Sequence, residues 1–159
     1  MGDEHPHKKV MSKAIEVARQ AAPSGNYKIG AVVVNGRMEV LASAFTELNS
    51  EPDPTAHAEI LALRRACSMV NSRYLPGCYL YTTLEPCPMC TSAAIWAKVG
   101  GVVFGATMED AASFARNAGP KFSWRQISIK SSYVVALGTP VIKLHEEFMR
   151  TECLKLGIE

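Results

Sequence analysis

The chain has 159 residues, a formal net charge of +2 at pH 7 and 48% hydrophobic residues. This length favours one domain over residues 1–159, with a core that needs no disulfide staples. No apolar run approaches the ~18 residues of a membrane span, and the near-neutral charge lacks the strong basic footprint common in nucleic-acid binders.

The first half of the chain predicts a helix, a hairpin and a second helix. Residues 8–22 show helical spacing of apolar residues, after a polar segment over 1–7 that we expect to be a flexible tail. Residues 29–34 predict a strand covered on both faces, because its apolar run does not alternate. Asn35-Gly36 predicts a two-residue hairpin turn into a strand over 37–44.

The centre of the chain predicts a helix, a strand and another helix. Asp53-Pro54-Thr55 supplies a stop and a cap for a helix over 56–70. After a turn at Pro76-Gly77, residues 78–83 predict a strand and residues 88–98 a helix.

The last third predicts a strand over 101–106, a next strand near Ile127 or Tyr133, and a final helix from Thr139-Pro140 to Gly157. A connection this long is typical of parallel pairing, since a hairpin needs only two to about five residues. We therefore expect an α/β domain of three α/β/α layers: a mixed five-stranded sheet, strands 4 and 5 parallel, with helices on both faces.

Three residues have the types and spacing of a zinc site. Cys87 and Cys90 lie three apart at a predicted helix start, where Pro88 fits the first turn and the helix dipole favours thiolates. His57 also lies at a predicted helix start. One histidine and two thiolates leave a fourth position on Zn²⁺ for water, which is typical of catalytic sites.

Glu59 adds a general acid–base group. It lies two residues after His57 and is not needed as a ligand, so it can take a proton from water and pass it to a departing nitrogen.

A lone Cys-x-x-Cys is often a redox pair or half of a zinc ribbon. A ribbon needs a second such pair, and the other cysteines, Cys67, Cys78 and Cys153, are scattered singly. The odd total of five cysteines and the absence of an apolar signal core predict a cytoplasmic protein.

His-x-Glu followed by Pro-Cys-x-x-Cys is the signature of zinc nucleobase deaminases. Four segments extend the likeness: Ile29-Gly30-Ala31-Val32, 53–59, 81–87 and Val102-Val103-Phe104-Gly105-Ala106. The chain thus resembles the cytidine-deaminase-like superfamily, in the branch of bacterial tRNA adenosine deaminases, guanine deaminases and fungal-type cytosine deaminases. The resemblance implies one catalytic Zn²⁺ on His57, Cys87 and Cys90, a proton shuttle at Glu59, and a homodimer.

Candidate substrate contacts flank these residues. The loop over 45–54 leads into His57, so Phe45 and Thr46 are expected to reach the ring, with core packing as the alternative for Phe45. The other candidates are Ala58, Glu85, Pro86 and Phe114. This chain departs from the family pattern at two positions. The family has an Asn that holds the base where this chain has Thr46, and the tRNA enzymes have an Asp where this chain has Met108.

Three functions follow from these residues. The favoured one is hydrolytic deamination of a small free base or nucleoside of guanine or cytosine type. The second is wobble-adenosine deamination in tRNA, because residues 111–145 interleave basic and aromatic side chains and contain no acid. The third is a zinc-containing scaffold without activity, which the presence of Glu59 disfavours.

Overall fold

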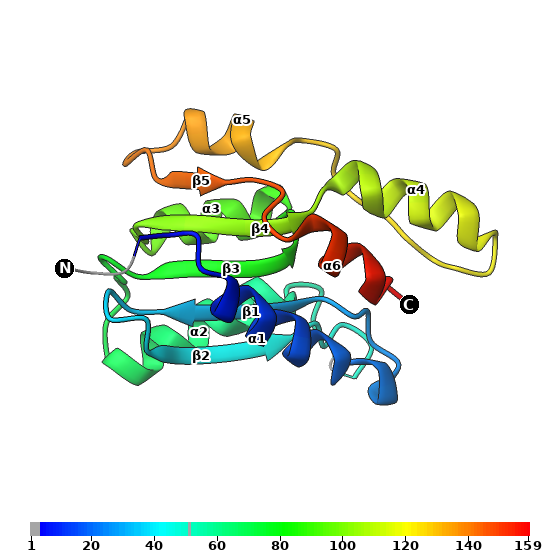
Figure 1. Cartoon of the computed structure of the whole chain (residues 1–159), viewed down its shortest axis with the longest axis horizontal. Coiled ribbons are helices and arrows are strands. Elements are labelled where there is room, and N and C mark those ends of the chain that lie inside the picture. Colours follow the sequence, from blue (N-terminus) through cyan, green and yellow to red (C-terminus); the bar gives the residue numbers. More distant parts are fainter. Residues whose placement is uncertain (1–3, 51) are drawn as a thin grey trace.

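The computed structural model describes residues 4–50 and 52–159 and shows one sheet flanked by helices (Figure 1). The elements in chain order are α1 (Lys8–Arg19), a 3₁₀ turn (Ala22–Ser24), β1 (Gly30–Val34), β2 (Val40–Phe45), α2 (Ala58–Val70), β3 (Tyr79–Leu84), α3 (Pro88–Trp96), β4 (Gly101–Ala106), α4 (Met108–Ala118), α5 (Ser131–Ala136), β5 (Lys143–His145) and α6 (Arg150–Leu156).

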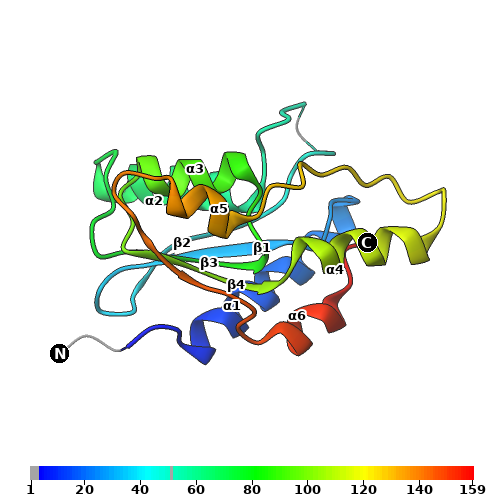
Figure 2. The ribbon, with the colours of Figure 1, turned by 90° about the horizontal axis from the view of Figure 1, so that it is seen from above.

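The sheet is mixed and five-stranded, in the order β2-β1-β3-β4-β5. β1 pairs antiparallel with β2 and β3, whereas β3, β4 and β5 run parallel, so the predicted parallel pairing of strands 4 and 5 is confirmed. Helices α2, α3 and α5 lie on one face, and α1 and α6 on the other (Figure 2). Every residue of β1, β3 and β4 is buried, as expected for strands covered on both faces.

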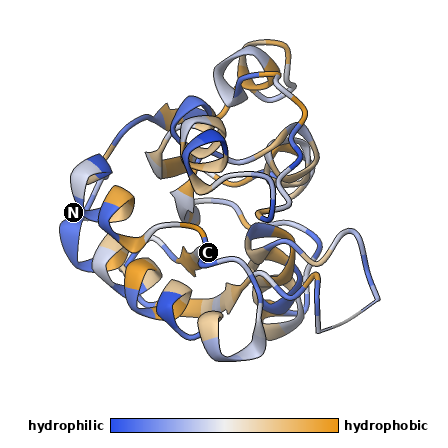
Figure 3. Cartoon of the chain, turned by 90° about the vertical axis from the view of Figure 1, so that its right-hand side faces the viewer, coloured by the Kyte–Doolittle hydropathy of each residue, from blue (hydrophilic) through white to orange (hydrophobic). Residues whose placement is uncertain are grey.

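Two glycines allow helices to approach the α1 face of the sheet closely. A Cβ at Gly30 would lie 2.2 Å from the Ala14 carbonyl oxygen and 2.6 Å from the Ala18 nitrogen, both in α1. A Cβ at Gly105 would lie 2.2 Å from Cys153 Sγ in α6. Both helices therefore pack directly on the strands. Figure 3 shows hydrophobic and hydrophilic stretches alternating along the helices, as expected when only one side of each is buried.

The local predictions in the first half need two corrections. The hairpin is not closed by a two-residue turn at Asn35-Gly36: the connection spans residues 35–39, and the Asn35 side-chain oxygen accepts hydrogen bonds from the backbone of Arg37 and Glu39. Helix α2 begins at Ala58 rather than at 56, because Asp53 Oδ1 caps a local turn by accepting from Thr55 N at 2.8 Å.

The last third of the chain departs further from prediction. The strand predicted near Ile127 or Tyr133 is wrong, since 131–136 is helix α5 and the fifth strand is Lys143–His145. The final helix predicted from Thr139-Pro140 is also wrong, because the chain first pairs with β4 and α6 begins only at Arg150. Strand-forming residues in α5 show that tertiary context overrides β propensity. Gly157 does end the last helix, with a φ of 66°.

The N-terminal segment contacts the α1 face of the sheet. The His5 ring stacks on Tyr79 with centroids 3.6 Å apart, and its Nδ1 lies 2.7 Å from the Tyr81 hydroxyl. The backbone of His7 donates to the same hydroxyl at 2.8 Å. Residues 5 and 7 of the predicted flexible tail are therefore held on β3, while residues 1–3 lie outside the described part. None of the helices in residues 4–50 and 52–159 has the length and hydropathy that a membrane span requires.

The Asp110–Arg150 pair joins α4 to α6, and its loss gives a stability prediction. Arg150 donates to both oxygens of Asp110, at 2.8 and 2.6 Å, and this lowers the pKa of Asp110 from 3.8 to about 2. A depressed carboxyl pKa stabilises the fold above the unfolded value and loses that contribution as pH falls from 3.8 toward about 2. We expect Arg150→Gln to lower the free energy of unfolding at neutral pH, and to lower it by less at about pH 3. Urea unfolding of both proteins at the two pH values measures this, and an equal difference at both would contradict it.

Candidate metal centre

The three predicted zinc ligands meet on one side of the sheet. His57 and Cys87 are the residues immediately before α2 and α3, and Cys90 lies in the first turn of α3. Pro88 occupies the first turn of α3, as predicted from its missing N–H. Two helix starts thus present one imidazole and two thiols to a common point.

The distances fit a metal centre. His57 Nδ1 lies 3.7 Å from Cys87 Sγ and 3.5 Å from Cys90 Sγ, and the three ligand atoms lie within 4.8 Å of one another. Within the described residues this is the only cluster of three or more His, Cys, Asp or Glu side chains with such spacing. One nitrogen and two sulfur donors at these separations suit Zn²⁺, which binds such donors at about 2.0 to 2.3 Å.

The thiols differ in their electrostatics. A hydrogen bond from Cys90, aided by His57, lowers the pKa of Cys87 to about 4, although its burial works in the opposite direction. The hydrogen bond to Cys87 and burial together raise the pKa of Cys90. The hydrogen bond with Cys87 raises the pKa of His57. The surroundings of Cys87 therefore favour its thiolate, the form that binds metal.

Glu59 is buried beside this cluster, with 4% of its surface exposed. Its Oε2 lies 3.8 Å from Cys90 Sγ, while its Oε1 lies 3.1 Å from the hydroxyl of Thr82 on β3. Burial raises the pKa of the Glu59 carboxyl above its usual range. The carboxyl group thus has one oxygen anchored to the sheet and the other beside the ligands.

The predicted contacts on the His57 side fall into two groups. Thr46 is buried, and its hydroxyl accepts from the backbone N–H of Ala58 at 3.4 Å. This bond links the loop after β2 to the first residue of α2, next to His57. Phe45 ends β2 and is half-buried. Contact of these three residues with a substrate remains a prediction.

On the cysteine side, Glu85 and Pro86 connect β3 to Cys87, and both are buried. The Glu85 carboxylate accepts from Met108 N at 3.1 Å, and from Ser131 N and Oγ at 2.9 and 3.1 Å. Both oxygens therefore hold backbone of other elements. Pro86 accepts from the Thr91 hydroxyl through its carbonyl at 3.1 Å, and its substrate contact remains a prediction.

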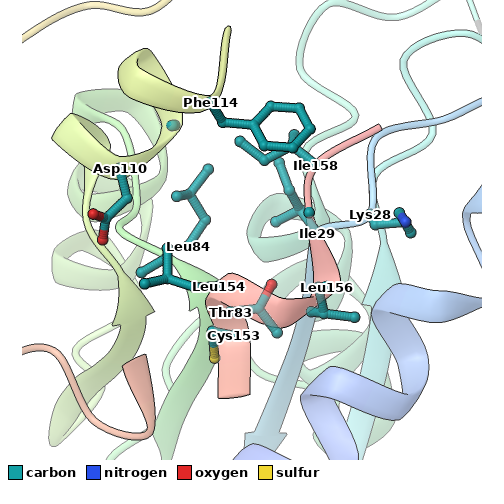
Figure 4. A pocket seen from close by; sticks show the side chains of 13 residues that line it. Lys28, Ile29, Thr83, Leu84, Asp110, Phe114, Cys153, Leu154, Leu156 and Ile158 are labelled. Atoms are coloured by element: carbon teal, nitrogen blue, oxygen red, sulfur yellow. The ribbon is translucent and has the colours of Figure 1, made fainter. Parts of the chain in front are cut away.

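Phe114 lines a separate small cavity of about 30 Å³ (Figure 4). Thr83, Leu84, Cys153 and Ile158 also line it, and none of the metal-binding residues does. The Phe114 ring packs edge-to-face on Phe122, with centroids 5.3 Å apart. The structure thus does not bring Phe114 together with the cluster, and its predicted substrate contact has no support from these neighbours.

Two residues that hydrogen-bond the candidate site residues escape sequence analysis. Thr82, which holds Glu59, lies in a strand whose six residues are all buried, so no alternation marks the face that it occupies. Ser131, which binds Glu85, lies 46 positions away in sequence, in a segment that lacks a recognisable motif. Only the packing of the whole domain reveals either contact.

Comparison with known proteins gives relatives of two activities. A guanine deaminase of Bacillus subtilis is 36% identical over 107 residues, which are 67% of this chain and 68% of the relative. A tRNA-specific adenosine deaminase of Aquifex aeolicus is 41% identical over 93 residues, which are 58% of this chain but only 61% of that relative. The chain thus spans less than two thirds of the Aquifex protein.

A solved structure agrees with the fold described above. The structure of NE0047 in complex with 2,6-diaminopurine superposes with a TM-score of 0.76 and 25% identity, and the alignment covers 92% of this chain and 77% of that one. The family model for the cytidine and deoxycytidylate deaminase zinc-binding region matches residues 4–106, which include all three metal-binding residues and Glu59. The chain therefore belongs to the family of proteins with a cytidine and deoxycytidylate deaminase zinc-binding region.

Proposed function

We propose that this protein is a zinc-dependent hydrolytic deaminase that removes an exocyclic amino group as ammonia. The observation that carries the proposal is the place of Glu59. A buried carboxylate with one oxygen fixed by Thr82 and the other 3.8 Å from Cys90 Sγ is not needed as a ligand and adjoins the cluster. A structural zinc site has no use for such a group, so the geometry disfavours the inactive scaffold.

The residues of the chain have distinct tasks in this reaction. His57, Cys87 and Cys90 hold the ion, which when bound supplies Lewis-acid chemistry and lowers the pKa of water toward about 7. Glu59 accepts the proton of the attacking water and delivers it to the departing amino nitrogen. Thr82 keeps the carboxylate oriented through both transfers. Burial of Glu59 excludes bulk water, which would compete for the proton.

The proposed substrate is a small free base or nucleoside of guanine or cytosine type, and a guanine-type purine is favoured. The support is the Bacillus guanine deaminase relative, which aligns over two thirds of both chains, and the purine bound to NE0047. The test is ammonia release by zinc-loaded protein from guanine, cytosine, isocytosine, adenine and their nucleosides. Turnover of none of these would overturn the proposal.

Deamination of a wobble adenosine in tRNA is the second candidate. It is supported by the Aquifex relative and by cations without ion pairs in the described structure, namely Arg116, Lys121 and Arg125. An anticodon stem-loop with a wobble adenosine belongs in the same assay. Turnover of the RNA alone would replace the small-molecule substrate with this one.

We also propose that the protein is a homodimer. Trp96 at the end of α3 is 81% exposed, and Leu137, the residue after α5, is 70% exposed. The two helices contact each other, and exposed apolar side chains that gather in one patch mark contact surfaces. Sedimentation of the zinc-loaded protein tests the oligomeric state, and a monomer at all concentrations would contradict the proposed homodimer.

The Thr82–Glu59 hydrogen bond gives a kinetic prediction. Thr82→Val removes the hydroxyl at nearly constant volume, and we expect kcat on the accepted substrate to fall about tenfold with little change in KM, because Glu59 loses the donor that orients it. Thr82→Ser should restore the rate. Equal kcat for the valine variant and wild type would show that Thr82 does not orient Glu59.

A further inference from the structure

A surface groove of about 230 Å³ lies between α4 and the extended segment that leads into α5. One wall is the face of α4 that carries Met108, Ala112 and Arg116. The other wall consists of alternate residues of the segment, Gln126, Ser128 and Lys130. The Gln126 amide donates to the Ser128 hydroxyl at 3.2 Å, which joins two neighbouring side chains of this wall.

Glu85 joins the two walls at their bases. Its Oε1 accepts from the backbone of Met108, the first residue of α4, and its Oε2 accepts from the backbone and hydroxyl of Ser131, the first residue of α5. Glu85 is only 6% exposed and has three donors, so it forms strong charge-assisted hydrogen bonds. It lies two residues before Cys87, and the same backbone therefore reaches the metal centre.

A second bridge crosses the groove at the surface. Lys130 Nζ lies 3.3 Å from Glu109 Oε1, and both side chains are at least 60% exposed. An exposed ion pair of this kind contributes little to stability. The buried carboxylate of Glu85 is therefore the stronger of the two bridges between the walls.

We propose that Glu85 is a positioning residue that ties both walls of this groove to the metal-binding loop, and that the groove binds the part of the substrate remote from the reacting carbon. The second part rests on the proposed function. Glu85 acts through Met108 and Ser131 and needs no contact with substrate. Glu85, the residue after β3, thus holds both ends of residues 108–131 in place.

Hydrogen exchange of Glu85→Gln, compared with Glu109→Gln, tests the positioning role without any substrate. The glutamine offers an oxygen to one wall only and turns its NH₂ toward an N–H of the other. We expect amide exchange in 107–118 or 126–136 to rise about tenfold or more, with exchange in α1 unchanged. Glu109→Gln, the same change on the exposed bridge, should raise it less than about twofold. Equal exchange in the two variants, or a rise throughout the chain, would overturn the proposal.

Kinetics test the role of the groove. For Glu85→Gln we expect one zinc per chain, KM raised about tenfold and kcat within about threefold of wild type. Loss of zinc, or a fall in kcat at unchanged KM, would instead place Glu85 in support of the metal centre.

Ser131→Ala removes one hydrogen-bond donor to Glu85 and keeps the carboxylate. This variant should therefore raise amide exchange and KM by smaller factors than Glu85→Gln does. If Glu85→Gln does not fold, the same two measurements on Ser131→Ala test the proposal. Should wild type turn over no base, nucleoside or RNA, the proposed function fails while the exchange result still stands.

Discussion

Glu59→Gln should reduce ammonia release at least about a thousandfold while one zinc per chain is retained. The amide keeps the size of the side chain and can still bond to Thr82, but it cannot accept the proton of water. General acid–base groups contribute about a hundred- to ten-thousandfold in rate, and Glu59 is the only described carboxylate that touches the metal-binding cluster. Steady-state ammonia release on the best substrate, with metal analysis of the same samples, measures the effect.

Glu16→Gln provides the matched control for this change. Glu16 is exposed on α1 and pairs with Lys13 at 3.4 Å, so the same chemical change there should leave rate and zinc content unaltered. Undiminished turnover by Glu59→Gln would remove the carboxylate from the mechanism. It would also remove the observation that carries the proposed function.

The metal centre could be predicted from the sequence because each of its parts is local. His57 and Glu59 lie at the start of one helix, Cys87 and Cys90 lie at the start of another, and Pro88 is the first residue of the second. The parallel pairing of β4 with β5 also followed from a length alone, since a long connection cannot be a hairpin.

The groove and the end of the chain could not be predicted, because long-range contacts decide them. Tyr133 lies in a segment with strand-forming residues, yet the segment is helical where Ser131 binds Glu85. Thr139-Pro140 has the residue types of a helix start, yet Lys143 pairs with the backbone of Gly100 instead. Local propensity is a weak guide where a buried carboxylate or a strand edge offers stronger partners.

Cys90→Ser should weaken zinc binding severely and lower the stability of the folded chain. Cys90 has no exposed surface and is one of the three described side chains that could hold the metal, and the serine hydroxyl does not replace a thiolate. We expect zinc affinity to fall more than about a hundredfold, and the urea midpoint to approach that of wild type treated with a chelator, because metal bound only by the folded state stabilises that state. Cys67→Ser is the control, since Cys67 lies on α2 outside the cluster and should retain full zinc and activity. Full zinc content in Cys90→Ser would show that two ligands suffice, and the assignment of this centre as a three-ligand site would then be wrong.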